Sequence, residues 1–428
     1  MVIPARDSAL ASALAPVLAL RRLPPPGSAR NVALYPWFRL FKSLSFYQAV
    51  WFLYFQDTLS AAEAILLYAV YDVATTALEV PSGWMSDRLG RRLTLIASAV
   101  AGMAGAAVLA AGASFEAFVL GQVLMGASMA FASGTDSAFL YESLAAEGRG
   151  GETEREEVRA WRFSFSALAV SAALGGALAM GAPALPYAVT ALALGGALAI
   201  GLAFREPARG EAGCVPRTLR TSSLVAAFRQ PVLAWLFVLG LVMYAFSHVP
   251  FVFGQPFILE ALAGTALEGR ETLASGAVTA VMMVVSVLAS LVAPGLRRRV
   301  GLAAMLLAAF AMQVGLIGAL ALSEQAAAVA LLFLRMVPDA WSRPFMLARM
   351  QPLLGDRNRA TFLSLQSFCG RLGFAVTLWL AAGGAGTGRM DFGGLQAVLG
   401  AYALGGIVLL ATLAVAASRI DIDRRTAT

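Results

Sequence analysis

The stretch GWMSDRLGRR, residues 83–92, interrupts a chain that is otherwise mostly apolar. It sets a carboxylate, Asp87, among arginines and between two glycines, Gly83 and Gly90. Glycine permits tight turns and close approach of the backbone, and a carboxylate is stabilised beside the free N–H groups at the start of a helix. The stretch therefore predicts a short charged connection that ends one apolar helix and begins another.

The composition of the whole chain places such helices in a membrane. Of its 428 residues, 59% are hydrophobic and 13% are charged, whereas soluble domains carry about 25% charged residues. Apolar segments of about 20 residues, the length that spans a bilayer, recur along the chain, and the short alternating segments of a membrane barrel do not. We expect an all-α polytopic membrane protein with twelve spans, near residues 36–56, 62–82, 93–112, 117–142, 160–181, 184–204, 232–256, 272–294, 302–322, 326–348, 360–382 and 394–417.

The arginines orient these spans, because cytoplasmic loops collect Lys and Arg. With the N-terminus inside, the inner segments hold the arginine clusters within 205–229 and 297–299, and the outer loops hold only Arg270 and Arg389. We therefore expect a multi-pass protein of the cytoplasmic (inner) membrane with both termini in the cytoplasm. The net charge of +7 then reflects this topology, and no nucleic-acid partner is expected.

The chain also divides into two similar halves. Its longest inner loop follows the sixth span, as in transporters built from duplicated bundles. The segments RAWRFSFS from Arg159 and RATFLSLQ from Arg359 open the fifth span of each half. We expect two pseudo-symmetric six-helix bundles in a monomer, with the chain divided into a tail at 1–34, a bundle at 35–204, a central cytoplasmic loop at 205–231, a second bundle at 232–418 and a tail at 419–428.

With this organisation, the opening stretch resembles the G-x-x-x-D-R-x-G-R-R signature of the major facilitator superfamily, in the loop where that family carries it. The matching residues are Gly83, Asp87, Arg88, Gly90, Arg91 and Arg92. The resemblance covers residues 35–418. It implies a secondary active transporter that works by alternating access. It also implies that Asp87 engages the other half of the protein and acts as a conformational latch. We expect the proton motive force to be the energy source of transport.

The direction of transport stays open in this resemblance. EVPSGWMSDRLGRR and GTDSAFLYESL look like segments of bacterial permeases often labelled as drug-efflux or uncharacterised transporters. The fifth span, however, lacks the antiporter signature G-x-x-x-G-P-x-x-G-G. We expect proton-coupled export of an amphipathic compound. Proton-coupled uptake of a small anionic metabolite or chelate is the alternative, as is a membrane receptor that does not transport.

Ionisable residues inside the spans are the candidates for proton coupling, since such residues usually face a bundle interior or a water-filled cavity. Asp72 lies about halfway along its span and is the first candidate, with an interhelical ion pair or hydrogen bond as the structural alternative. Glu79 shares its helical face and is expected to support the loop at 83–92, through Arg371. Asp136 and His248, the only histidine, complete the candidates.

Candidates for the substrate cavity combine aromatic, amide and charged side chains on the predicted inner faces. Arg335 and Asp339 are four residues apart and are spaced to pair; contact of Arg335 with an anionic substrate is equally open. The full set is Tyr47, Tyr54, Gln122, Tyr244, Arg335, Asp339 and Arg371. The expected partners are a small molecule, protons and the lipid bilayer.

An enzyme is not expected. The chain has a single histidine and contains neither H-E-x-x-H nor G-x-S-x-G, and no phosphate-binding loop falls on the cytoplasmic side. Its two cysteines, Cys214 and Cys369, offer no metal-ligand spacing. No cofactor or metal is therefore expected.

Overall fold

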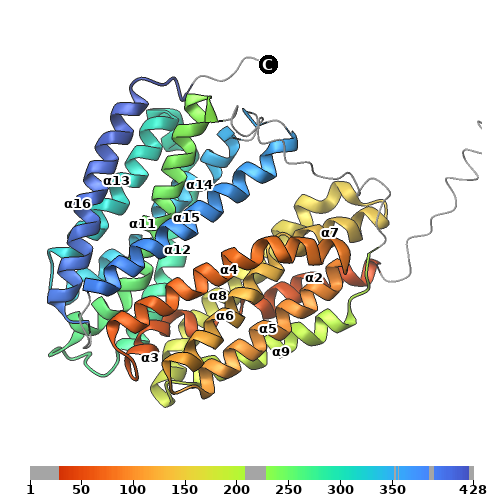
Figure 1. Ribbon diagram of the computed structural model, residues 1–428, viewed down its shortest axis with the longest axis horizontal. Helices are drawn as coiled ribbons and strands as arrows, with labels where there is room; N and C mark the ends of the chain where they lie inside the picture. The colour runs from red at the N-terminus through yellow and green to blue at the C-terminus, as the bar shows by residue number, and fades with distance from the viewer. Residues whose placement is uncertain (1–27, 208–227, 351–352, 355, 385–389, 424–428) are drawn as a thin grey trace, which may run out of the picture.

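The computed structural model describes residues 28–207, 228–350, 353–354, 356–384 and 390–423 (Figure 1). The expectations for most of the N-terminal tail, most of the central loop and the last residues of the C-terminal tail lie outside these ranges. The described chain is helical and has no strand within these ranges. This confirms the predicted all-α class.

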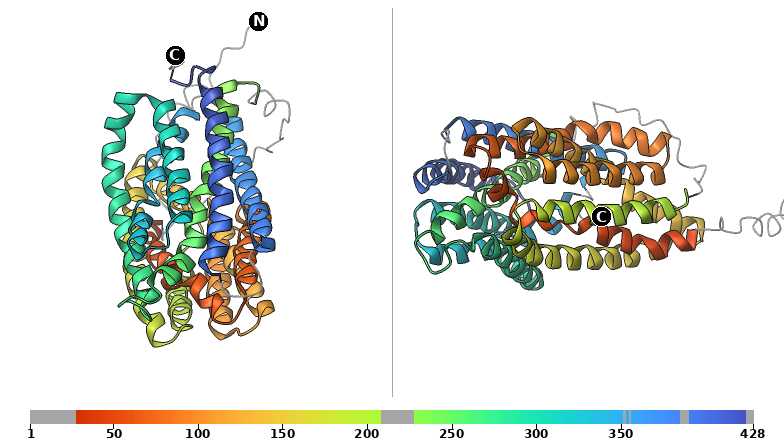
Figure 2. Two further views of the ribbon diagram at one scale, coloured as in Figure 1. Left: turned by 90° about the vertical axis from the view of Figure 1, so that its left-hand side faces the viewer. Right: turned by 90° about the horizontal axis from the view of Figure 1, so that it is seen from below.

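The first half of the chain forms one group of helices (Figures 1 and 2). In chain order these are α2 (Ser28–Ser43), the 3₁₀ helix η1 (Phe46–Ala49), α3 (Trp51–Gln56), α4 (Ala61–Arg88), α5 (Arg91–Ala111), α6 (Phe115–Ala132), α7 (Thr135–Ala146), the 3₁₀ helix η2 (Gly150–Glu152), α8 (Thr153–Gly181) and α9 (Leu185–Ala203).

The second half forms another group, which lies at an angle to the first and diverges from it toward the upper right of Figure 1. Its elements are α11 (Pro231–Leu262), α12 (Glu271–Val300), α13 (Leu302–Ala321), the 3₁₀ helix η4 (Ala326–Leu334), α14 (Val337–Met350), α15 (Asp356–Gly384) and α16 (Phe392–Ala417).

Ten helical stretches among the described residues are long and apolar enough to cross a membrane. The predicted spans at 36–56 and 326–348 are not continuous α-helices, so the structure does not confirm the count of twelve. The first is divided among α2, η1 and α3, and the second between η4 and α14. Pro338 stands at the start of α14. It has no N–H to donate to the carbonyl four residues earlier, so it disfavours a helix that runs through it and is favoured in a first helical turn.

The third long helix of each half begins in the same way, with a glycine of positive φ and a carboxylate that accepts from backbone N–H at the start of the helix. Gly90, with φ of 112°, precedes α5, whose first N–H groups donate to the Glu206 carboxylate that follows α9. Gly301, with φ of 84°, precedes α13, where the Leu302 N–H donates to Asp423 beyond α16. Carboxylates are favoured at helix N-termini. The repeated arrangement fits a duplicated bundle.

The two groups of helices are sealed against each other near α3 and α12. The Gln255 amide accepts from the Phe52 N–H at 2.8 Å and donates to the Gln48 carbonyl at 3.1 Å. Beside it, the Ser275 hydroxyl donates to the Ala49 carbonyl. Each contact joins the first half of the chain to the second, so this end of the molecule is closed.

Glycines allow α8 and α12 to pack closely at the same end. A Cβ atom at Gly276 would lie 2.7 Å from the Ala172 carbonyl oxygen, and one at Gly176 would overlap the Thr272 carbonyl. Small residues permit such close approach between membrane helices. α4 and α15 provide a second contact between the halves.

Candidate functional site

A cavity of about 540 Å³ lies between the two halves. The first half contributes side chains from α2, η1, α3, α4 and α6–α9, and the second half from α11 and the junction of η4 with α14. Its aromatic lining comprises Phe38, Tyr47, Trp51, Tyr68, Tyr71 and Phe251, and its charged lining comprises Arg39, Lys42, Asp136, Arg335, Asp339 and Arg343.

Both carboxylates of the lining are held by arginines. Asp136, at the start of α7, pairs with Arg39 on α2. Asp339 pairs at 3.4 Å with Arg343, one turn later on α14. The cavity therefore presents no free acid among the described residues that line it.

Of the two alternatives left open for Arg335, the ion pair with Asp339 does not form, since Asp339 pairs with Arg343. The spacing of four residues assumed one continuous helix, but Arg335 follows the 3₁₀ helix η4 and precedes α14. Its Nε instead donates to the Met282 sulfur at 3.2 Å. The guanidinium carbon lies 5.1 Å from the centre of the Phe251 ring, a favourable cation–π distance.

Lys42 is the second cation of the lining without a carboxylate partner among the described residues. Its ammonium group donates to the Ser128 hydroxyl and lies 3.3 Å from the Ser128 carbonyl oxygen. With Arg335, it leaves two unbalanced positive charges in the cavity, one in each half of the chain.

A buried ion pair joins the halves outside the cavity lining. Asp72 on α4 is 1% exposed, and its carboxylate lies 3.3 Å from the Arg371 guanidinium on α15. The Tyr244 hydroxyl of α11 donates to the same carboxylate at 3.3 Å. Arg371, which was expected near Glu79, thus forms its ion pair with Asp72, two turns earlier on α4.

His248 stands between this pair and the cavity. It lines the cavity, and its ring centre lies 4.2 Å from that of Tyr244. Nδ1 is 2.7 Å from the Tyr244 carbonyl oxygen. A carbonyl can only accept, so Nδ1 carries the hydrogen, and Nε2 of the neutral ring is an acceptor.

The remaining cavity candidates are divided. Tyr47 and Gln122 line the cavity together with Arg335 and Asp339. Tyr54 lies away from it and donates its hydroxyl to the Leu109 carbonyl at 2.7 Å. Tyr244 and Arg371 surround Asp72 instead of lining the cavity.

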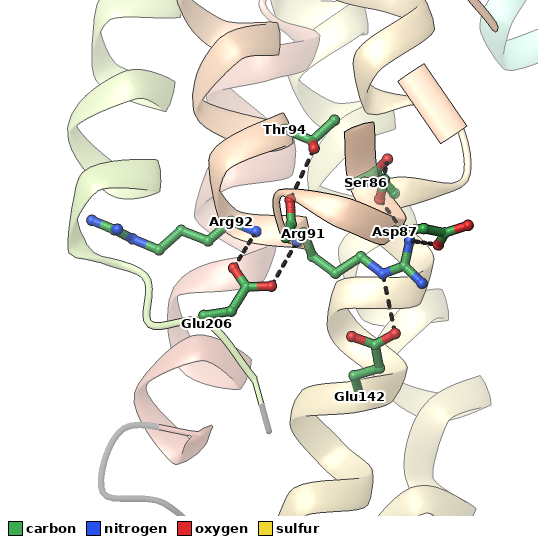
Figure 3. Close-up of polar contacts among 9 residues, drawn as sticks. Ser86, Asp87, Arg91, Arg92, Thr94, Glu142 and Glu206 are labelled. Carbon is green, nitrogen blue, oxygen red and sulfur yellow. Dashed lines mark hydrogen bonds and ion pairs between the residues drawn. The ribbon is translucent and has the colours of Figure 1, made fainter. Parts of the chain in front are cut away.

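The predicted connection at 83–92 is wrong in extent: α4 continues to Arg88 and α5 begins at Arg91, so only Leu89 and Gly90 lie between the helices (Figure 3). The first N–H groups of α5 bind the Glu206 carboxylate and not Asp87, which stands in the last turn of α4.

The Arg91 guanidinium binds Asp87 at 2.9 Å and, through Nε, Glu142 of α7 at 3.1 Å. It also donates to the Ser86 hydroxyl at 2.6 Å. The Asp87 side chain is 72% exposed, and its ion pair lies within its own half. Its predicted role as a latch toward the other half stays a prediction.

The major facilitator superfamily model matches residues 32–378, most of the chain. The chain belongs to this family. Solved structures of several transporters share its fold, among them NupG, a Spinster homologue and a POT family transporter. The nucleoside transporter NupG aligns with a TM-score of 0.73 at 16% identity, covering 90% of this chain and 99% of NupG. At such low identity the likeness establishes the fold alone.

The other two are also superfamily transporters. A bacterial homologue of the human lysosomal transporter Spinster, in an inward-facing and unoccupied conformation, aligns with a TM-score of 0.70 at 15% identity, covering 94% of this chain and 99% of that one. An auto-inhibited POT family peptide transporter aligns with a TM-score of 0.69 at 12% identity, covering 93% and 99%. The superfamily fold is that of a secondary transporter of small molecules.

One curated relative matches a short part of the sequence. Solute carrier family 2, facilitated glucose transporter member 10 of Danio rerio is 37% identical over 68 residues. These make up 16% of this chain and 13% of the relative. So short a match adds no information on the substrate.

The predicted set of cavity residues left out Lys42 and Phe251, which both line the cavity. Lys42 is the only lysine in the chain and lies in a predicted span. A charged side chain at membrane depth usually faces a cavity or the bundle interior, so its position could have marked it as a cavity residue. Phe251 carried no such signal, since a phenylalanine in an apolar helix is ordinary. Its importance comes from Arg335, which reaches it from another helix.

Proposed function

We propose that the protein is a proton-coupled secondary transporter that exports an amphipathic organic anion. The observation that carries this proposal is Arg335, which lines the cavity from the second half without a carboxylate partner among the described residues. A guanidinium in such a place is costly unless a counter-charge reaches it. An anionic substrate supplies that charge.

The lining supports an anion over a cation. A cationic substrate would need a free carboxylate, and Asp136 and Asp339 are both engaged by arginines. The aromatic side chains of the same cavity suit the apolar part of an amphipathic molecule, since ligand sites are mostly apolar with a few placed polar groups.

Asp72 is the proposed coupling residue. Its pair with Arg371 joins α4 to α15 and hence the two halves, which must move against each other in alternating access. Protonation of Asp72 removes its charge and so weakens the contact between the halves. His248 and Tyr244 lie between the cavity and the pair and offer a route for the proton.

Charge movement supports export as the direction of transport. Each elementary charge that crosses a membrane exchanges about 2.3 kcal/mol per 100 mV. With a negative interior, export of an anion and entry of a proton both move charge in the favourable sense. Export therefore gains from both parts of the proton motive force.

The test uses inside-out vesicles with an acidic lumen and a pH-sensitive dye. An aryl sulfonate is added outside, because a sulfonate stays ionised and does not carry protons through lipid. We expect release of lumenal protons by the wild type, loss of the signal in Asp72→Asn, a weaker signal in Arg335→Gln and partial recovery in Arg335→Lys. Proton release by amphipathic cations and not by sulfonates would contradict the proposal.

A further inference from the structure

We infer that the cavity takes a two-ended dianion, with one anionic group at Lys42 and the other at Arg335. This rests on the proposed function and narrows its substrate class. The two cations stand on walls contributed by different halves of the chain. The argument begins with how each is held.

Lys42 contacts a polar platform between α5 and α6, formed by the hydrogen-bonded pair Ser98 and Ser128. The hydroxyls of Ser98 and Ser128 each donate to the other residue's carbonyl, at 2.6 and 2.7 Å. A Cβ atom at Gly102 would lie 2.5 Å from the Ser128 hydroxyl oxygen, so a glycine there leaves room for this arrangement. Both serine hydroxyls already donate to carbonyls, and Ser128 accepts from the ammonium group. These neutral acceptors hold the ammonium group and leave its charge in place.

The ammonium group has a donor left for a ligand. A lysine carries three N–H donors, and the contacts to the hydroxyl and the carbonyl of Ser128 engage two of them. The nearby carboxylate of Asp136 is taken by Arg39. A carboxylate, sulfonate or phosphate oxygen that enters the cavity can accept from the third.

Arg335, from the second half of the chain, is held in a similar way. Met282 of α12 accepts from its Nε, and the Phe251 ring of α11 lies beneath the guanidinium. These contacts orient the group and supply no negative charge. The terminal N–H groups form the planar fork that binds carboxylates and phosphates through two parallel hydrogen bonds.

A molecule whose single anionic group binds at one of the two cations neutralises only that cation. It leaves the other cation without a counter-charge in a largely apolar cavity, which is costly. A molecule with an anionic group at each end satisfies both. Once its first anionic group is bound, the second is present at a high effective concentration near the other cation, which increases the affinity.

The same geometry gives the substrate a place in the transport cycle. Lys42 belongs to the first half and Arg335 to the second, so a bridging dianion holds the two moving bodies together. The other charged side chains of the lining are already in the pairs Arg39–Asp136 and Arg343–Asp339. They offer no third site for an anionic group.

The experiment measures dissociation constants from thermal stabilisation of the purified full-length protein. The probes are unbranched monocarboxylates and α,ω-dicarboxylates of increasing chain length, with a phosphate monoester that carries both charges on one group. The variants are Lys42→Gln, Arg335→Gln and their double, with Lys42→Arg and Arg335→Lys as charge-preserving controls.

We expect the dicarboxylates to bind best at one chain length, roughly tenfold to a hundredfold more tightly than the matched monocarboxylate. Either glutamine variant should reduce this advantage to about one, and the charge-preserving variants should keep part of it. If the glutamine variants fail to fold, Lys42→Arg and Arg335→Lys still test the inference. Each changes the length of a cationic side chain and should therefore shift the dicarboxylate chain length that binds best.

Dicarboxylates that bind no more tightly than monocarboxylates at any length would overturn this inference and leave anion transport standing. Tighter binding of the phosphate monoester than of every dicarboxylate would overturn it too, in favour of a single anionic group held by both cations. Stabilisation by amphipathic cations alone would overturn the proposed function itself.

Discussion

The carboxylate of Asp72 and the guanidinium of Arg371 lie 3.3 Å apart and connect α4 to α15 across 299 residues of sequence. The pair is shielded, since Asp72 is 1% exposed and Arg371 is 16% exposed. Removal of one partner from a buried pair leaves the other charge without compensation. The contact therefore links the stability of the closed α4–α15 interface to the charge on one carboxylate.

A double-mutant cycle tests this link. We expect Asp72→Asn and Arg371→Gln each to lower the free energy of unfolding by roughly 3 kcal/mol, and the double variant to lose clearly less than the sum. Thermal unfolding in detergent measures all four proteins. Strict additivity would show that the two side chains do not depend on each other.

The start of α5 gives a second prediction. Gly90 has φ of 112°, and a Cβ atom there would lie 2.7 Å from the Glu206 carboxylate. Gly90→Ala should therefore cost about 1–3 kcal/mol of stability through backbone strain and loss of the cap. Gly83→Ala is the matched control, because nothing lies within 4 Å of its position. Equal effects on the melting temperature of the two variants would contradict this account.

The packing of α8 against α12 gives a third. Gly276→Ala places a methyl group against the Ala172 carbonyl and should loosen the sealed end, whereas Gly295→Ala on the same helix meets nothing within 4 Å. The measurement is the rate of disulfide cross-linking between Ala49→Cys and Ser275→Cys, in a background without native cysteines. We expect a several-fold slower rate for Gly276→Ala only.

The charged segment at 83–92 gives a fourth prediction, which tests the expected role of Asp87 as a latch. Asp87 is 72% exposed and has one ion pair, with Arg91 at the start of α5, so Asp87→Asn should change stability by no more than about 0.5 kcal/mol. If Asp87 holds another state of the transport cycle, transport should nevertheless fall several-fold. Proton-release rates in vesicles and melting temperatures separate the two readouts.

Its control is Glu142→Gln, which weakens the same Arg91 network from the less exposed side. Here we expect the larger loss of stability. Unchanged transport in Asp87→Asn would remove the latch role and leave the residue as a partner of Arg91.

The spacing of residues along a predicted helix shows which side chains share a face, and part of the site could be predicted in this way. Asp72 and Glu79 share one face of α4 by their period. Spacing could not say which of them meets Arg371, because the two lie two turns apart and the choice depends on how α15 crosses α4. It also failed at Arg335, where a 3₁₀ helix changes the register that the α-helical period assumes.

The sequence by itself determined that this is a helical membrane protein with two related halves and a charged segment where one apolar helix gives way to the next, because composition and helical period act locally. It did not show that α4 continues to Arg88 and leaves a connection of two residues. Tertiary structure decided the charge balance of the cavity. Each acid and each cation has several possible partners in a list of residues, and only packing selects one. That selection left Lys42 and Arg335, from different halves, as the two cations facing the same space without a carboxylate partner among the described residues.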